Sequence, residues 1–75
     1  MIKDLLSAIA NKYNVTISYQ ENHAEFTGFP DTFAGRFDKG NLRSDIEELL
    51  ISQGYLLFKT YSSVNPSTII VEWQE

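Results

Sequence analysis

The sequence predicts one α+β domain over residues 1–75, with the element order αββαββ and two helices packed on small β-sheets. Two observations lead to this class. Segments whose apolar residues recur at helical spacing alternate with segments in which apolar residues recur at every second position. The two halves also repeat each other, because the spacing of Ile2, Leu5 and Leu6 returns 44 residues later, starting at Ile46.

Two αββ repeats of this size cannot each bury a helix stripe and a sheet face alone, so we expect them to pack together. Convergence on two common patterns is the alternative explanation of the repeat. A circularly permuted ferredoxin-like order is the alternative fold, reached by moving one edge strand from the end of the chain to its start.

The first helix is predicted from its apolar face, which consists of Ile2, Leu5, Leu6, Ile9 and Tyr13. Asn14 suits the left-handed conformation that ends a helix. A half-buried strand follows over residues 15–20, where apolar and polar residues alternate. The polar run QENHAE interrupts this alternation, so it is predicted to be a loop that carries His23.

The segment after this loop is predicted to be a second strand. Pro30 followed by Asp31 marks a turn or an edge, because proline does not fit inside a central strand. A short strand is predicted over residues 32–38, and residues 24–29 are predicted to approach it in an irregular or bulged conformation. One face of the predicted strand over residues 32–38 would carry Phe33, Gly35 and Phe37. Gly28 and Gly35 are expected to mark a bulge or a close backbone approach.

The second helix is predicted to begin near Asn41, with either Asn41 or the Ser44–Glu47 capping box at its start. Its apolar stripe is Leu42, Ile46, Leu49 and Leu50. Gly54 is expected to follow its last residue as a left-handed C′ position. A strand over residues 55–61 and a final strand over residues 68–73 come next. The final strand is apolar on both faces, which predicts an interior position in the sheet.

Composition restricts the function of the chain. Ten acidic and six basic residues give a net charge of −4, which argues against a nucleic-acid binder. Without cysteine, the chain has no disulfide and no thiolate metal site. We identify no signal peptide and expect no membrane insertion. The expected compartment is the cytoplasm if Met1 is the native start, and the periplasm if the chain is an excised domain.

Specific chemistry is not expected from the residues present. His23 lacks the nucleophile elbow that a hydrolase triad needs, and a single histidine without cysteine does not form the usual zinc sets. The glycine-containing run TGFPDTFAGRF matches no phosphate-binding motif. Arg36, Lys39 and Arg43 cluster near aromatic residues, but acidic residues lie among them, which favours a solvated loop or the charged rim of a protein interface over a nucleic-acid platform. We therefore predict no enzyme activity, no cofactor and no metal.

The aromatic residues are the main candidates for binding another protein. Ten of them are more than so small a core is expected to bury, so some should be exposed. Phe26, Phe29 and Trp73 are the first candidates, with core burial as the alternative for each. The predicted interface consists of Phe26, Phe29, Phe33, Arg36 and Trp73.

Several motifs together resemble a known family. LLSAIANKYNVTISY, FTG, FAGRF, LRSDIEELL and TIIVEW resemble the C-terminal domain of FecR-type anti-sigma regulators. That domain is related to the short N-terminal signalling domain of secretins and TonB-dependent receptors. The resemblance covers nearly the whole chain, at positions that determine the fold. It implies a periplasmic module of two repeated units, without catalytic residues, that binds a receptor signalling domain.

A second function also agrees with the sequence. A small acidic protein encoded by a phage or mobile element, which binds and inhibits a host enzyme or nuclease, would have the same size, charge and lack of chemistry. In both cases the partner is another protein. We expect binding through a sheet edge or through the aromatic segment from Phe26 to Phe37.

Overall fold

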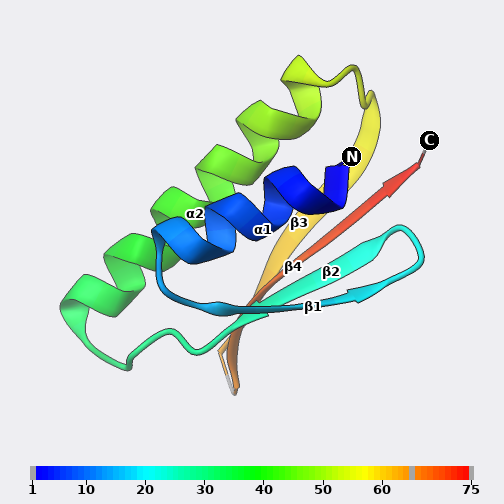
Figure 1. The fold of residues 1–75 in the computed structure, drawn as a ribbon. Coiled ribbons are helices and arrows are strands. Elements are labelled where there is room, and N and C mark those ends of the chain that lie inside the picture. The colour runs from blue at the N-terminus through cyan, green and yellow to red at the C-terminus, as the bar shows by residue number, and fades with distance from the viewer. Residues whose placement is uncertain (1, 65, 75) are drawn as a thin grey trace.

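The computed structural model describes residues 2–64 and 66–74 and confirms the predicted order αββαββ. The elements are α1 (Ile2–Lys12), β1 (Thr16–Gln20), β2 (His23–Thr27), α2 (Phe33–Ser52), β3 (Leu57–Val64) and β4 (Ser67–Gln74). The strands of both repeats join one four-stranded sheet, and both helices cover the same face of it (Figure 1). The molecule is therefore an α+β fold in two layers.

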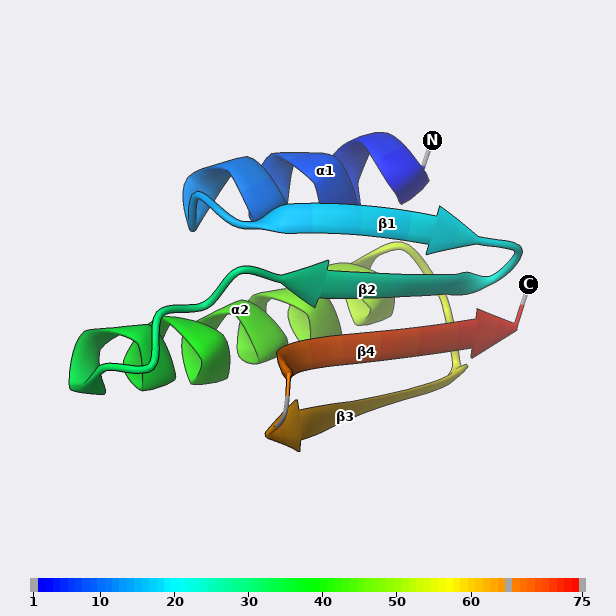
Figure 2. The same ribbon diagram turned by 90° about the horizontal axis from the view of Figure 1, so that it is seen from below.

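The sheet has the strand order β1-β2-β4-β3, and all neighbouring strands are antiparallel. Each repeat contributes one outer and one central strand (Figure 2). The central position of β4 confirms the prediction made from its apolar pattern. The strands β2 and β3 are connected through α2, and β4 lies between them in the sheet. The segment β2-α2-β3 is therefore a split βαβ unit, as in a permuted ferredoxin-like order. The strand that such a permutation moves is β4, a central strand and not an edge strand.

A single core fills the space between the helices and the sheet. The helices contribute Ile2, Leu6, Ala10, Leu42, Ile46 and Leu50, all buried. The strands contribute Ala24, Phe26, Ile69, Val71 and Trp73, and the loop before α2 contributes Phe29. Side chains in a strand point alternately to the two faces. One face of β2 and β4 therefore packs on the helices, and the other forms the outer face of the sheet.

Both predicted helix ends are confirmed by the backbone. Asn14, two residues after the end of α1, has a φ of 57°, and Gly54 has a φ of 85° after the C-cap residue Gln53 of α2. Only glycine adopts this left-handed region without cost, and asparagine tolerates it better than most residues. The two turns that lead from a helix into the sheet were therefore readable from single residues.

The predicted strand over residues 32–38 is wrong, because this segment is the first part of α2. The helix begins at Phe33, well before Asn41, and its N-cap is Thr32. The Thr32 side chain accepts a hydrogen bond of 3.0 Å from the Gly35 N–H, which satisfies one free donor of the first turn. Asn41 and the Ser44–Glu47 box lie inside the helix and do not cap it.

The second strand lies in the run that was predicted to be polar loop and bulge. Glu21 and Asn22 form a tight turn in which Asn22 has a φ of 55°. The strand β2 then starts at His23 and pairs regularly with β1 and β4. His23 and Glu25 point to the outer face, so the polar residues that obscured the strand are its exposed side. The predicted bulge at residues 24–27 is absent from these regular ladders.

Candidate functional site

The most exposed aromatic side chains of the chain lie together on the first turns of α2. Phe33 is 76% exposed and Phe37 is 65% exposed. Their rings form an edge-to-face pair with centroids 5.8 Å apart. Figure 2 shows that this end of α2 extends past the ends of the strands, so the sheet does not cover it. We call Phe33, Arg36, Phe37, Gly40, Asn41 and Ser44 the α2 patch.

The position of this patch follows from helical geometry. The buried residues of α2 are Gly35, Leu42, Ile46 and Leu50. At 3.6 residues per turn, Phe37 lies roughly 140° around the helix axis from Leu42. By the same count, Phe33 lies roughly 180° from Leu42, on the opposite side of the helix. The same fold that buries the stripe therefore turns both phenylalanines away from the core. Exposed apolar area of this kind marks interaction sites more often than single exposed residues do.

The α2 patch surrounds a shallow groove of about 500 Å³. Phe33 and Phe37 give it an apolar wall, while Asn41 and Ser44 give it amide and hydroxyl groups. Arg36 lies beside the two rings and is paired with Asp31 at 3.4 Å, and both side chains are largely exposed. A pair so exposed contributes little to stability. Its guanidinium is therefore available to a partner at little cost to the fold.

Three of the five predicted interface residues are not at the surface. Phe26 is completely buried, Trp73 is 4% exposed and Phe29 is 7% exposed. The expectation that these three are exposed is wrong because each reaches the core from the sheet or from the loop before α2. Only Phe33 and Arg36 of the predicted set are exposed, and they lie together on α2.

The other basic residues near the patch are engaged in the fold. Lys39 donates to the backbone oxygen of Ser63 at 2.7 Å, and Arg43 donates to the backbone oxygen of Thr60 at 2.7 Å. These contacts fasten α2 to β3. Lys39 and Arg43 consequently do not extend the exposed charge of Arg36 into a continuous basic platform.

A charged cluster crosses the outer face of the sheet. His23 lies between two carboxylates, with Nε2 at 2.9 Å from Glu25 and Nδ1 at 3.0 Å from Glu72. Glu72 also pairs with Lys59 at 3.3 Å. The hydrogen bond to Glu25, with help from Glu72, raises the pKa of His23, while burial opposes this change. The hydrogen bond from His23 lowers the pKa of Glu72.

We expect this cluster to make stability depend on pH in a defined direction. A raised His23 pKa contributes stability that is complete below the unfolded value of 6.5 and is lost as the pH rises through the folded value. The lowered Glu72 pKa contributes stability above 4.5 that is lost in acid. Thermal unfolding should therefore give a higher Tm at pH 5.5 than at pH 8.5, about one pH unit below and two above the unfolded value.

The control for this effect is His23→Gln, which keeps a polar side chain but cannot become charged. The chain contains no second histidine, so the variant should lose most of the difference between the two pH values. An equal fall of Tm in the wild type and in the variant would contradict the assignment to His23.

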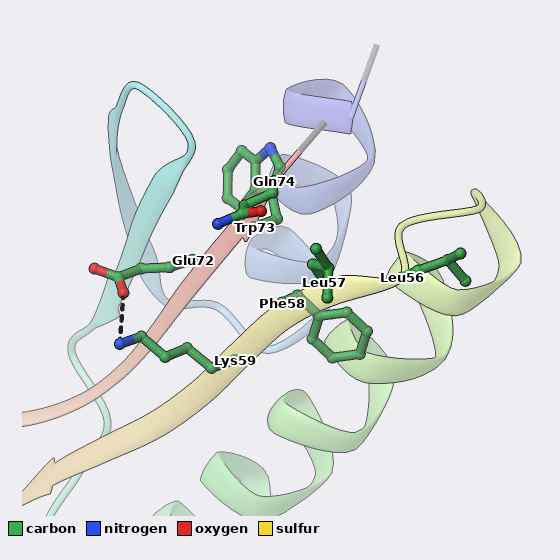
Figure 3. Close-up of a pocket in the computed structure, with 7 residues that line it drawn as sticks. All are labelled: Leu56, Leu57, Phe58, Lys59, Glu72, Trp73 and Gln74. Atoms are coloured by element: carbon green, nitrogen blue, oxygen red, sulfur yellow. Dashed lines mark ion pairs between the residues drawn. The ribbon is translucent and has the colours of Figure 1, made fainter.

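A second groove lies at the start of β3, and Figure 3 shows the side chains around it. It has a volume of about 490 Å³ and includes the exposed residues Leu56 and Leu57. Trp73 also borders it, and its indole Nε1 is buried without a hydrogen-bond partner within the described residues. The groove joins an apolar rim to the Lys59–Glu72 pair shown in Figure 3.

A polar contact joins the two helices. The Asp45 carboxylate accepts hydrogen bonds from Tyr13 at 2.6 Å and from Lys12 at 2.9 Å. The Tyr13 bond, followed by the Lys12 bond, lowers the pKa of Asp45. The three side chains are used in this helix–helix contact, and we assign them a structural role.

Within residues 2–64 and 66–74, no group of three or more histidine, cysteine or acidic side chains is placed to bind a metal ion. None of the helices in this part of the chain is long and apolar enough to cross a membrane. Comparisons with protein-family models, with curated proteins and with solved structures found no match to the chain.

Two features of the site were missed in the sequence, namely that Phe33 and Phe37 share the exposed side of a helix and that Leu56 and Leu57 are exposed. Only the first had a usable signal. Phe33 and Phe37 are four residues apart, which is helical spacing, and they lie off the Leu42–Leu50 stripe. Extending the second helix toward Thr32 would have placed both on its exposed side. The exposure of Leu56 and Leu57 had no such signal, because apolar residues at a strand start are usually buried.

Proposed function

We propose that the chain is a non-enzymatic protein–protein interaction module that binds its partner through the α2 patch. One observation carries this proposal: Phe33 and Phe37 form an exposed aromatic pair on the part of α2 that extends past the sheet. Because both phenylalanine side chains are exposed to water, they contribute little to the stability of the fold. Covered by a partner, each would contribute to binding by removing apolar area from water.

The local structure suits a rigid anchor. The Thr32 cap fixes the first turn of the helix, so the rings project from ordered backbone. A preorganised surface loses little conformational entropy on binding. Aromatic residues and arginine are the residues most often found at binding hot spots, and the patch combines Phe33, Phe37 and Arg36. The expected partner has an apolar pocket for the rings and an acidic group within reach of Arg36.

The kind of partner follows from the resemblance at sequence level. We propose a receptor-facing signalling module of an anti-sigma regulator, whose partner is the signalling domain of an outer-membrane receptor or a secretin. The rival proposal is a stand-alone inhibitor of a host enzyme or nuclease, supported by the acidic balance of the chain. Both use the same surface, and they differ in the identity of the bound protein.

The test is a quantitative pull-down from a lysate of the source organism, with the tagged wild-type chain and two variants. The first variant, Phe33→Ser with Phe37→Ser, removes the aromatic pair. The matched control is Ile51→Ser, which changes another exposed apolar residue, 66% exposed, at the opposite end of the same helix. Proteins retained by the wild type are identified by mass spectrometry, and their affinity is then measured with purified components.

Specific binding through the patch predicts one protein that the wild type and Ile51→Ser retain and the double variant loses. The affinity should fall at least about tenfold, which corresponds to about 1.4 kcal/mol. A partner bound equally by all three proteins would contradict the proposed site. A receptor or secretin as partner would support the signalling role, and a cytoplasmic nuclease or polymerase would support the inhibitor.

A further inference from the structure

The outer side of α2, which faces away from the sheet, is open over the length of the helix. The sheet lies under α2, and α1 lies beside it (Figures 1 and 2). The chain enters and leaves α2 on the side of the sheet (Figure 1). A helix of 20 residues is about 30 Å long. This side of α2 therefore offers a surface long enough for another helix.

Five residues of α2 share this outer side. Phe33, Phe37, Gly40, Ser44 and Ile51 fall within a sector of roughly 60° at 3.6 residues per turn, and Phe33 and Ile51 are five full turns apart. The exposed fractions of the three apolar side chains are 76%, 65% and 66% in chain order. Gly40 and Ser44 are also exposed. We call these five residues the outer line of α2.

The outer line is complementary to itself when it is reversed. Its residues follow one another at intervals of four, three, four and seven, which is the heptad spacing of helices that pack side by side. Phe33 and Phe37 lie at one end of the line, Ile51 lies at the other, and the small residues lie in the middle. An antiparallel second copy would therefore place apolar side chains against apolar side chains at both ends.

We propose that α2 packs antiparallel on α2 of a second copy of this chain, so that each copy covers the α2 patch of the other until another protein displaces it. Since the dimer uses the α2 patch, this assignment rests on the proposed function of that patch as a binding surface. The twofold axis crosses the outer line between Gly40 and Ser44. The same surface is used on both copies, so the assembly closes as a dimer.

The register pairs the residues of the outer line by size. Phe33 packs on Ile51 of the other copy, which removes apolar area from water at both ends of the contact. Gly40 faces Ser44 of the other copy at the centre. These small side chains let the two helices approach closely and leave room for the ring of Phe37.

The charges beside the outer line also match in this register. Arg36 and Glu47 lie on the same side of the line, and a twofold axis between antiparallel helices brings like sides together. Arg36 consequently lies near Glu47 of the other copy, which is the acidic group that the α2 patch requires. Both side chains are accessible, because Arg36 is 77% exposed in its pair with Asp31 and Glu47 is 44% exposed beside Arg43.

The position of α1 leaves room for the second copy. The groove between the helices is lined on α2 by Asp45, Glu48, Leu49 and Ser52, which all lie on the C-terminal side of the twofold axis. The axis places this part of one α2 opposite the N-terminal part of the other. The α1 helices of the two copies therefore lie at opposite ends of the helix pair and do not occupy the same space.

The dimer is expected to be weak because one helix of each copy takes part. Stable interfaces use roughly 20–30 residues on each side, and smaller ones belong to the transient class. We expect the dimer at concentrations of about 0.1–1 mM and the monomer at about 10 μM.

The first experiment is analytical ultracentrifugation of the wild type and two lysine variants across this concentration range. Ile51→Lys places a charge on the outer line, against Phe33 of the other copy, and leaves the α2 patch unchanged. Leu57→Lys is the matched control, because Leu57 is 64% exposed but lies on β3. The wild type and Leu57→Lys should approach twice the mass of 8.6 kDa, and Ile51→Lys should remain at 8.6 kDa.

The second experiment tests the antiparallel register with single cysteines, since the chain contains none of its own. A Phe33→Cys chain mixed with an Ile51→Cys chain in glutathione redox buffer should form a mixed disulfide, because these two positions face each other. Each variant alone should form little, since its two cysteines lie about 27 Å apart along the helix pair. A disulfide of Phe33→Cys with itself that forms as fast as the mixed one would overturn the register.

The dimer and the proposed function can fail separately. A wild type that stays monomeric at the highest concentration would overturn the dimer, and so would a dimer that Ile51→Lys leaves intact. The pull-down of the proposed partner would still stand in both cases, because it compares variants of the aromatic pair. A dimer that behaves as expected, with no lysate protein lost by the aromatic double variant, would contradict the proposed function alone.

Discussion

Phe29→Ala is expected to destabilise the domain by about 3–5 kcal/mol, whereas Phe33→Ala should change its stability by no more than about 0.5 kcal/mol. The two residues are of one type and lie four positions apart. Phe29 is 7% exposed and packs in the core, and Phe33 is 76% exposed on α2. Removing the first leaves a cavity, and removing the second only removes area that water already contacts.

The size of the first effect is large for this chain. Domains of this kind are stable by about 5–15 kcal/mol, and a chain of 75 residues lies at the lower end of that range. Phe29→Ala should therefore be largely unfolded at moderate urea concentrations at which the wild type is folded. Urea unfolding followed by circular dichroism measures both variants. Equal midpoints for Phe29→Ala and the wild type would show that the loop before α2 does not contribute to the core.

Gly35→Ala is expected to destabilise the domain by about 1–3 kcal/mol, and Gly40→Ala is expected to stabilise it by up to about 1 kcal/mol. Both glycines lie inside α2, where alanine is the better helix former. A Cβ at Gly35 would overlap the carbonyl group of Pro30, which is backbone and cannot turn aside. A Cβ at Gly40 would meet nothing within 4 Å.

The opposite signs make this pair informative, because helix propensity alone predicts a gain at both positions. Urea unfolding of the two variants measures the difference directly. A gain at Gly35 as large as that at Gly40 would mean that the loop through Pro30 moves freely. The contact with Pro30 would then not determine where the first turn of α2 lies.

The sequence was sufficient for those elements in which one strong period was supported by a clear boundary. The stripe of α2 from Leu42 to Leu50 and the apolar strand β4 are of this kind. Asn14 and Gly54 then placed two of the turns, because a left-handed backbone position restricts the residue strongly. These features depend on local conformation, so they could be read without knowing which elements are neighbours in space.

The sequence was ambiguous where two periods coincided. Phe33, Gly35 and Phe37 alternate like a strand, but Phe33 and Phe37 also have helical spacing, and the Thr32 cap decides for the helix. The strand β2 was hidden because its outer side chains are the polar residues His23 and Glu25, and His23 also pairs with a carboxylate of β4. That partner, Glu72, lies far along the chain.

The exposure of the aromatic residues could not be predicted from the sequence for a related reason. Whether Trp73 or Phe26 faces the helices depends on which side of the sheet the helices cover. A shift of one residue in a strand reverses every side chain on it. The expectation that some aromatics remain exposed was sound, but the choice among them needed the position of α2.

The central place of β2 and β4 in the sheet has a consequence for the order of folding. Each half of the chain forms its own hairpin from residues that are close in sequence, namely β1 with β2 and β3 with β4. In the sheet the two halves meet where β2 pairs with β4, as at Phe26 and Ile69, which lie 43 residues apart in the chain. Closing so long a loop costs entropy before any contact repays it, and it slows folding. We therefore expect this central pairing to limit the folding rate, with the two hairpins forming first.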